Sequence, residues 1–434
     1  MSAVIDLGEM RHGEDGDEPL PASPRRPPGR VARVVALGCL ALLAVTGAAA
    51  PARRPAPVRV PAPAGAAFVV LADRLMVADG PSTIGRGGRG GRVVSGHRLP
   101  GGEPLWRFSL PAGDHVIGLG VAAGGLLVTS SPTGAGEPFS TLLDPDTGAS
   151  RWRRPGYPVA TAAGGLLLES PPTAAGTASV RAVDPASGAV RWTLSIPAQG
   201  VAYRTDGHGV TQLVLVTPDG RVAVHDADTG APAYTGRVPA APDGVSYRYA
   251  QVVADLLLVD GDPGTVTAYG LDRLDARWTV RVQERAGLWF TDCAGMVCLR
   301  DQVGGARTLD PATGRPAWAD ERWLGFAPVD GRLLAATAGI GAELDRWVLE
   351  PTTGRVLGRL GRWRITGTDR EPGGLLGLRH LTGDRTLVGA LDVPAAQARI
   401  RAVLPGSWDE CADSGTVLVC LRPAGGLTIW PVGR

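Results

Sequence analysis

Three stretches of sequence decide the fold: LDPDTGASRW at residues 143–152, VDPASGAVRW at 183–192 and LDPATGRPAW at 309–318. Each has an aspartate, a glycine four residues later and a tryptophan four residues after the glycine. Self-similarity with a fixed internal spacing indicates a repeated structural unit. The residues that match are Asp144, Gly148 and Trp152; Asp184, Gly188 and Trp192; and Asp310, Gly314 and Trp318.

Weaker copies of the motif keep the same phase along the chain. Tyr234 replaces the tryptophan in one copy, Gly358 in another and Ile400 in a third. Successive copies are roughly 42 residues apart, which is the length of a four-stranded repeat. The sequence therefore contains eight units, whose third motif position falls at residues 106, 152, 192, 234, 278, 318, 358 and 400.

Each unit is predicted to form two β-hairpins. An apolar run precedes the motif, as in GGLLVTS at 124–130 and GGLLLES at 164–170, and such runs between turn residues are typical of buried strands. Within the motif, the aspartate oxygen accepts from turn amides and the glycine supplies a positive φ. The aromatic residue then begins the outermost strand, where we expect it to pack between neighbouring units.

Units that cannot bury their own apolar faces must stack, and four-stranded units of this length stack radially into a propeller. The order of apolar strand, Asp-x-x-Thr/Ser-Gly turn and Trp resembles the repeat of pyrroloquinoline-quinone (PQQ) enzymes. That family includes quinoprotein dehydrogenases and a non-catalytic propeller lipoprotein of outer-membrane assembly. The resemblance covers residues 66–434 and implies an all-β fold, a β-propeller of about eight four-stranded blades.

Closure of the ring is the least determined part of this prediction. The segments 408–411, 417–421 and 427–430 supply three strands of a last blade. We expect the strand at Trp106 to complete that blade, which leaves the segment from Phe68 to Ala78 as an additional hairpin or edge cover.

The N-terminal region has a different composition. Val34 to Ala50 carries no charge and is just long enough to cross a bilayer as a helix. We therefore expect a polar cytoplasmic leader at 1–30, a transmembrane signal-anchor helix at 31–50 and a proline-rich linker at 51–65, with the propeller at 66–434 outside the cytoplasm. Two alternatives are cleavage after Ala50, which Pro51 disfavours, and lipidation of Cys39, whose surroundings match a lipoprotein box poorly.

Four cysteines follow the apolar segment, in two pairs that share the sequence Val-Cys-Leu-Arg. Each pair brackets a short turn, so adjacent strands bring the two sulfurs within bridging range. We expect disulfides between Cys293 and Cys298 and between Cys411 and Cys420. The alternative is a four-cysteine zinc site, which the wide separation of the pairs disfavours.

Composition excludes several functions. The formal net charge is +2, with both signs mixed along the chain, so the sequence offers no basic surface for nucleic acid. The chain has no lysine and no asparagine. A Walker lysine, a Schiff-base lysine and an Asn glycosylation site are therefore impossible.

The resemblance raises the question of catalysis. In the alcohol-oxidising members it implies PQQ held by an adjacent Cys–Cys disulfide, a stacking tryptophan and a Ca²⁺ ion coordinated partly by asparagine, and this chain lacks the Cys–Cys pair and asparagine. We expect a non-catalytic binding or scaffold module for a protein or cell-envelope ligand, without cofactor, metal or catalytic residues. The alternative is a PQQ-dependent oxidoreductase, with PQQ and Ca²⁺, similar to the less restrictive sugar-oxidising branch.

Overall fold

The computed structural model describes part of the chain. The chain divides into two compact units, Met1–Pro55 and Ala56–Arg434, and every strand below belongs to the second. No helix of the described residues is long and apolar enough to cross a membrane; the predicted leader and anchor, apart from residue 29, lie outside these residues. The structure describes residues 29, 56–71, 73–81, 92–134, 136–171, 178–197, 200–242, 244, 247, 250–260, 264–282, 289–300, 305–366 and 374–431.

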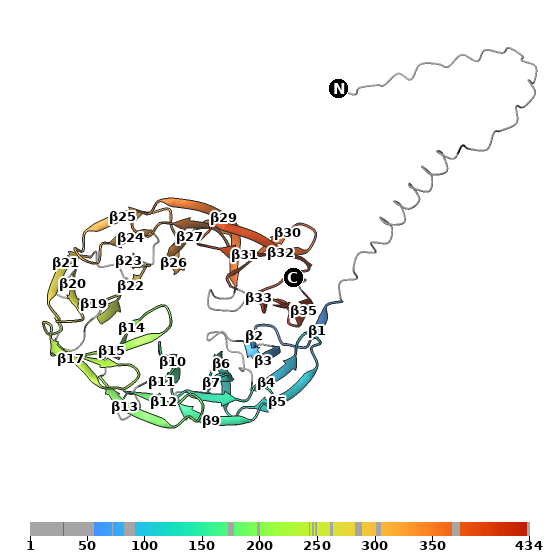
Figure 1. Ribbon diagram of the computed structural model, residues 1–434, viewed down its shortest axis with the longest axis horizontal. Helices are drawn as coiled ribbons and strands as arrows, with labels where there is room; N and C mark the ends of the chain where they lie inside the picture. Colours follow the sequence, from blue (N-terminus) through green and yellow to red (C-terminus); the bar gives the residue numbers. More distant parts are fainter. Residues whose placement is uncertain are drawn as a thin grey trace, which may run out of the picture. The chain divides into compact units, whose positions relative to one another are not determined.

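The second unit is built from antiparallel strands arranged as a ring (Figure 1). Six four-stranded sheets follow chain order, and we call them blades 1 to 6. They are blade 1, β2 (Ala66–Leu71), β3 (Arg74–Pro81), β4 (Val93–Arg98) and β5 (Pro104–Ser109); blade 2, β6 (Asp114–Ala122), β7 (Gly125–Pro132), β8 (Phe139–Leu143) and β9 (Ser150–Pro155); blade 3, β10 (Tyr157–Ala160), β11 (Leu166–Ser170), β12 (Ala178–Val183) and β13 (Val190–Ile196); blade 4, β14 (Ala202–Thr205), β15 (Val210–Val216), β16 (Arg221–Asp226) and β17 (Pro232–Arg237); blade 5, β18 (Ala250–Val253), β19 (Leu256–Asp260), β20 (Thr265–Gly270) and β21 (Ala276–Arg281); and blade 6, β22 (Trp289–Asp292), β23 (Val297–Arg300), β24 (Ala306–Leu309) and β25 (Pro316–Asp320).

Two blades share a strand. The next sheet has seven strands, β26 (Gly325–Val329), β27 (Arg332–Ile340), β28 (Glu343–Leu349), β29 (Val356–Thr366), β30 (Leu376–Leu381), β31 (Arg385–Asp392) and β32 (Gln397–Pro405). The first part of β29 pairs with β28 and its last residues pair with β30. It is therefore the outermost strand of blade 7 and the innermost strand of blade 8.

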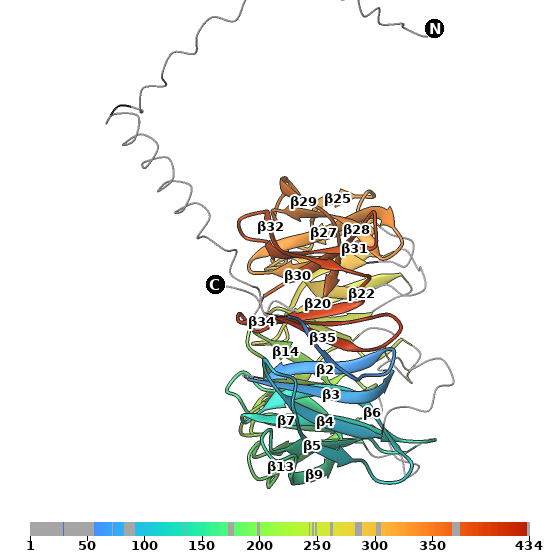
Figure 2. The ribbon, with the colours of Figure 1, turned by 90° about the vertical axis from the view of Figure 1, so that its right-hand side faces the viewer.

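The ring closes through the two ends of the second unit. A last sheet, the closing blade, contains β33 (Glu410–Asp413), β34 (Val417–Leu421) and β35 (Leu427–Pro431), and its fourth strand is β1 (Val58–Val60). β1 pairs antiparallel with β35, with Val58 opposite Ile429. Viewed from the edge of the ring, β35 and β2 lie side by side at this closure (Figure 2).

The all-β fold and the repeated four-stranded sheets are as predicted, but the predicted closure is wrong. The strand that contains Trp106 is β5 of blade 1, and the segment from Phe68 to Ala78 supplies the inner strands of that blade. Val58 to Val60, which we expected in the linker at 51–65, completes the closing blade instead. The eight repeats form blades 1 to 8, so the closing blade is a further four-stranded unit.

The hydrophobic core lies between successive blades rather than inside any one of them. One cluster joins Leu142 and Trp152 of blade 2 to Leu166 and Leu168 of blade 3. Both faces of β19, the second strand of blade 5, are covered, since all five of its residues are buried. A blade removed from the ring would expose both faces, which is why the repeats are stable only when stacked.

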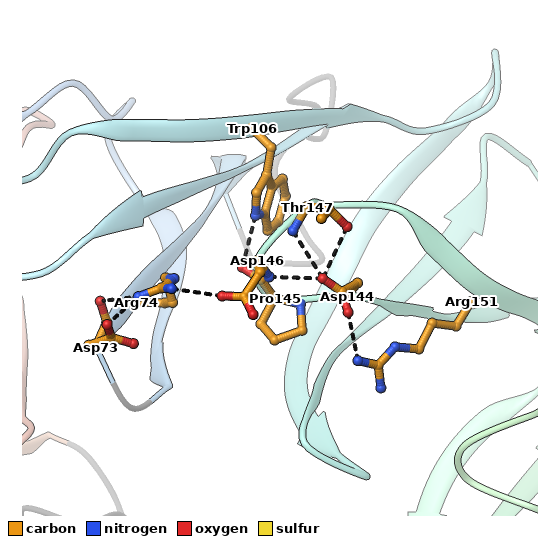
Figure 3. Close-up of polar contacts among 8 residues, drawn as sticks. All are labelled: Asp73, Arg74, Trp106, Asp144, Pro145, Asp146, Thr147 and Arg151. Atoms are coloured by element: carbon orange, nitrogen blue, oxygen red, sulfur yellow. Dashed lines mark hydrogen bonds and ion pairs between the residues drawn. The ribbon is translucent and has the colours of Figure 1, made fainter.

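The repeat motif forms the contact that joins one blade to the next (Figure 3). Trp106 of blade 1 donates its indole Nε1–H to the carbonyl of Pro145, 2.9 Å away in the turn of blade 2. A Cβ on Gly148 would lie 2.5 Å from the Trp106 ring, so the ring lies directly on this glycine. The same bond recurs from Trp152 to Pro185, Trp278 to Pro311 and Trp318 to Pro351, and Trp192 bonds one residue further along the turn, to Asp228.

The aspartate holds the turn on which the tryptophan lies. Asp144 Oδ1 accepts from the backbone N–H of Thr147 at 3.0 Å and from its hydroxyl at 3.0 Å. Gly148 has φ +69°, a conformation that a side chain would strain. A hydrogen bond from Arg151, 2.7 Å from Asp144 Oδ2, and the bonds from Thr147 lower the Asp144 pKa to about 2.

Two weaker copies of the motif depart from this contact. Gly358 leaves no ring over the next turn, where Ala396 takes the glycine position with φ +52°. Ile400 pairs with Gly389 because the register shift of the β31–β32 hairpin lies between Val388 and Gly389, further from the turn than the shift between Leu142 and Leu143 in blade 2. Ile400 is therefore 54% exposed, unlike the buried Trp106 and Trp152.

Candidate functional site

The two predicted disulfides are present. Cys293 is bonded to Cys298 and Cys411 to Cys420, with Cα–Cα distances of 5.8 and 4.1 Å. Each connects the first two strands of its blade, and all four cysteines are buried. Such bridges brace the inner hairpins of blade 6 and of the closing blade.

The predicted repeat residues lie on three separate blades and at five different junctions, and they do not converge on one cavity. Asp144, Gly148 and Trp152 belong to blade 2; Asp184, Gly188 and Trp192 to blade 3; and Asp310, Gly314 and Trp318 to blade 6. The rings of the repeat tryptophans lie on turn glycines, so they are not free to stack on a quinone. Within the described ranges, no group of three or more His, Cys, Asp or Glu side chains could hold a metal ion.

A groove between blades 3 and 4 is the best candidate for a binding site. It is a cavity of about 760 Å³ between the end of β13 and the strands β15, β16 and β17. This volume lies within the range of about 300 to 1,000 Å³ that is common for ligand pockets. The lining residues are Ser195, Ile196, Pro197, Leu215, Thr217, Arg221, Val222, Ala223, Thr235, Gly236 and Arg237.

Two small side chains face each other in the wall of the groove. Ala223 lies opposite Thr235 on blade 4. The equivalent pair, one residue from the aromatic position, is Arg181 and Thr193 on blade 3. On blade 2 the pair is Thr141 and Arg153. One member of the pair is therefore an arginine on blades 2 and 3, whereas neither member is on blade 4.

The mouth of the groove is positively charged. Arg221 and Arg237 are 70% and 65% exposed, and the carboxylate beside them is Asp219, 2.8 Å from Arg221 and 3.9 Å from Arg237. A hydrogen bond from Thr217 and the charge of Arg221 hold the Asp219 pKa below its usual value. Two cations therefore share one carboxylate above a largely apolar wall.

Sequence reasoning missed this groove. The sequence does contain a sign of it, because Ala223 is equivalent in register to Arg181 of the preceding blade. That equivalence depends on the hairpin bulge next to the aromatic residue, and the bulge cannot be read from the motif alone.

These features define the chain as a β-propeller with an apolar, cation-rimmed groove between two of its blades. The segment 89–270 matches a family model described as outer membrane protein assembly factor BamB. The predicted PQQ-like repeat is confirmed over this segment, which is less than half of the chain and includes the whole groove.

Several solved structures are similar to this chain. BamB from Moraxella catarrhalis is 16% identical, with a TM-score of 0.37 over 88% of this chain and 98% of that one. The computationally designed Ika8 protein is 13% identical, with a TM-score of 0.43 over 72% and 95%. The C-terminal WD40 domain of Sif2 is 10% identical, with a TM-score of 0.38 over 88% and 98%. No curated protein sequence matches.

Proposed function

We propose that this protein is a membrane-anchored, extracytoplasmic β-propeller that acts as a binding or scaffold module for another protein of the cell envelope. The observation that carries the proposal is the groove between blades 3 and 4, which lies inside the segment that matches the BamB family model. The two disulfides support an oxidising compartment. The uncharged stretch from Val34 to Ala50 supports the anchor.

The chemistry of the groove indicates which partner it suits. Ile196, Leu215 and Ala223 offer an apolar wall, while Arg221 and Arg237 stand at the mouth with one carboxylate between them. An extended segment that inserts an apolar side chain and places an acidic residue beside it satisfies both features. Burial of the apolar group supplies affinity, and the arginines orient the segment.

The test places an arginine in the groove at the position where blade 2 has one. Thr235→Arg copies Arg153 at the equivalent position, and Thr279→Arg is the matched control on the exposed outer strand of blade 5. Crosslinking in native membranes identifies partners, and each is then purified and titrated against the propeller. We expect Thr235→Arg to weaken binding by at least about tenfold and Thr279→Arg to leave it unchanged. A partner that binds both variants equally would show that the groove is not the contact.

The enzymatic alternative and the anchor have separate tests. Purified protein mixed with PQQ and Ca²⁺ should show no saturable cofactor absorbance and no dye reduction; both signals together would favour the oxidoreductase. A reporter that works only outside the cytoplasm, fused after Arg434, should be active in the full-length chain. Activity of a cytoplasm-specific reporter at that position would contradict the anchored orientation.

A further inference from the structure

A second cavity lies where the shared strand β29 leaves blade 7 and enters blade 8. Its volume is about 370 Å³, which is large enough for a small ligand. The end of β27 contributes Ile340, and the turn before β28 contributes Gly341 and Ala342. The remaining lining residues are Glu343 of β28, Arg362 and Arg364 of β29, and His380 of β30.

The carboxylate in the cavity wall, Glu343, and the carboxylate that pairs with Arg364, Asp409, are both already engaged. Glu343 Oε1 accepts the backbone N–H of His380 at 2.7 Å and lies 2.8 Å from His380 Nδ1. Its side chain is only 11% exposed, so it forms part of the inner wall. Asp409 pairs with Arg364 at 3.1 Å, and the same guanidinium donates to the carbonyl of Trp408.

Arg362 has donors to spare. Its side chain is 41% exposed, and its ion pair with Glu343 runs through Nε at 3.5 Å, where no hydrogen bond forms. Among the described residues no hydrogen bond is made by its two terminal nitrogens. Arg359, on the same strand, differs because its Nε and Nη2 both bind Asp345, at 3.0 and 2.7 Å.

The mouth of the cavity adds an apolar element to this charge. Ile340 is 70% exposed although it lines the cavity together with Arg362. Covering an exposed isoleucine with a ligand lowers the free energy, because apolar surface is removed from water. A planar guanidinium with free donors matches the two oxygens of a carboxylate or of a phosphate.

We infer that this cavity binds a small organic anion, whose carboxylate or phosphate group contacts Arg362 and whose apolar part covers Ile340. Arg364 adds positive potential and is held in place by Asp409, while Glu343 orients the His380 ring. The site lies on blades 7 and 8, far along the chain from the groove of blades 3 and 4, so it stands or fails independently of the proposed function.

Calorimetric titration of the full-length protein, in buffer free of phosphate and carboxylate, tests the charge. Butyrate and inorganic phosphate are the anionic probes, and butyramide is the uncharged control. We expect saturable binding of butyrate, at least about tenfold weaker binding in Arg362→Gln, and unchanged binding in Arg359→Gln. Arg362→Lys should retain part of the affinity, and melting temperatures verify that all variants fold.

A second arm separates organic from inorganic anions. Ile340→Ser should weaken butyrate binding and leave inorganic phosphate binding unchanged. The inference is overturned if wild-type protein binds neither anion, if butyramide binds as tightly as butyrate, or if Arg362→Gln and Arg359→Gln behave alike. The inference would also be overturned if phosphate bound more tightly than butyrate and its affinity were the same in the Arg362 and Ile340 variants as in wild type.

Discussion

The junction between blades 2 and 3 and the junction that closes the ring place different residues on the same turn. In the first, the Trp152 ring lies on Gly188 and donates a hydrogen bond to the Pro185 carbonyl. In the second, a Cβ on Gly102 would lie 2.8 Å from Val58 and 3.1 Å from Val60. The turn glycine is common to both, so it sets the distance between blades, whereas the residue above it can change.

The closing junction needs other support because it has no indole donor. Its outer strand and third strand come from opposite ends of the second unit, so no turn joins them. Main-chain pairing between β1 and β35, burial of Val60 and the Cys411–Cys420 disulfide replace the tryptophan contact. Perturbing these features one at a time shows how much each kind of junction contributes.

The largest effect is expected at the closure. Val60 is 2% exposed, and Val60→Asp would bury an unpaired carboxylate between the closing blade and blade 1. We expect it to lower the free energy of unfolding by about 5 kcal/mol, enough to open the ring. Chemical denaturation measures this change. Arg59→Asp, exposed on the same strand, is the control and should alter stability little; equal effects would mean that β1 does not seal the ring.

An ordinary junction should lose somewhat less. Trp152→Ala removes a 5% exposed ring from between blades 2 and 3, and large-to-small core substitutions of this kind cost about 3 to 4 kcal/mol. Trp152→Phe, which keeps most of the ring but loses the bond to Pro185, should cost about 1 kcal/mol. Denaturation midpoints distinguish them. An unchanged midpoint in Trp152→Ala would contradict the packing described for the repeat.

The disulfides should rank next. Chain-entropy reasoning gives roughly 2 to 3 kcal/mol for each short loop. Replacing Cys411 and Cys420 by serine should lower the melting temperature more than replacing Cys293 and Cys298, because the first pair stiffens the blade that closes the ring. Scanning calorimetry of the two double variants measures the difference. A larger loss from the Cys293 and Cys298 variant would contradict this ranking.

The smallest effect is a pH dependence at the turn. The Asp144 pKa is lowered from 3.8 to about 2, so its ionised form stabilises the fold above pH 3.8, and that contribution is lost as the pH falls towards 2. Because Asp144 is near the surface, the effect is small. At neutral pH the wild-type protein should have a higher melting temperature than Asp144→Asn, and this difference should become smaller between pH 4 and pH 2. A difference in melting temperature that stays constant over this range would show that the charge of Asp144 does not stabilise the turn.

The sequence predicted the junctions that repeat and missed those that do not. Trp152, Trp192 and Trp318 were identifiable because each follows Asp and Gly at a fixed spacing. β1 has three residues within a proline-rich stretch, so neither length nor alternation marks it as a strand. Its pairing with β35 is determined by the geometry of the whole ring rather than by local sequence.

The binding features were hidden for a related reason. The groove depends on which residue faces Ala223 across a hairpin, and that register is shifted by a bulge. The second cavity depends on β29 continuing from one blade into the next. A single sequence shows strand content well, but a shift of one residue moves every side chain to the other face.

The pairing of Val58 with Ile429 also fixes the order in which the ring can form. The strand that completes the closing blade is among the first parts of the second unit to be synthesised, and its partner is among the last. Until β35 emerges from the ribosome, β1 has no neighbour to pair with, so closure is the final event of folding. Reopening of the ring at this blade therefore requires the pairing between β1 and β35 to break.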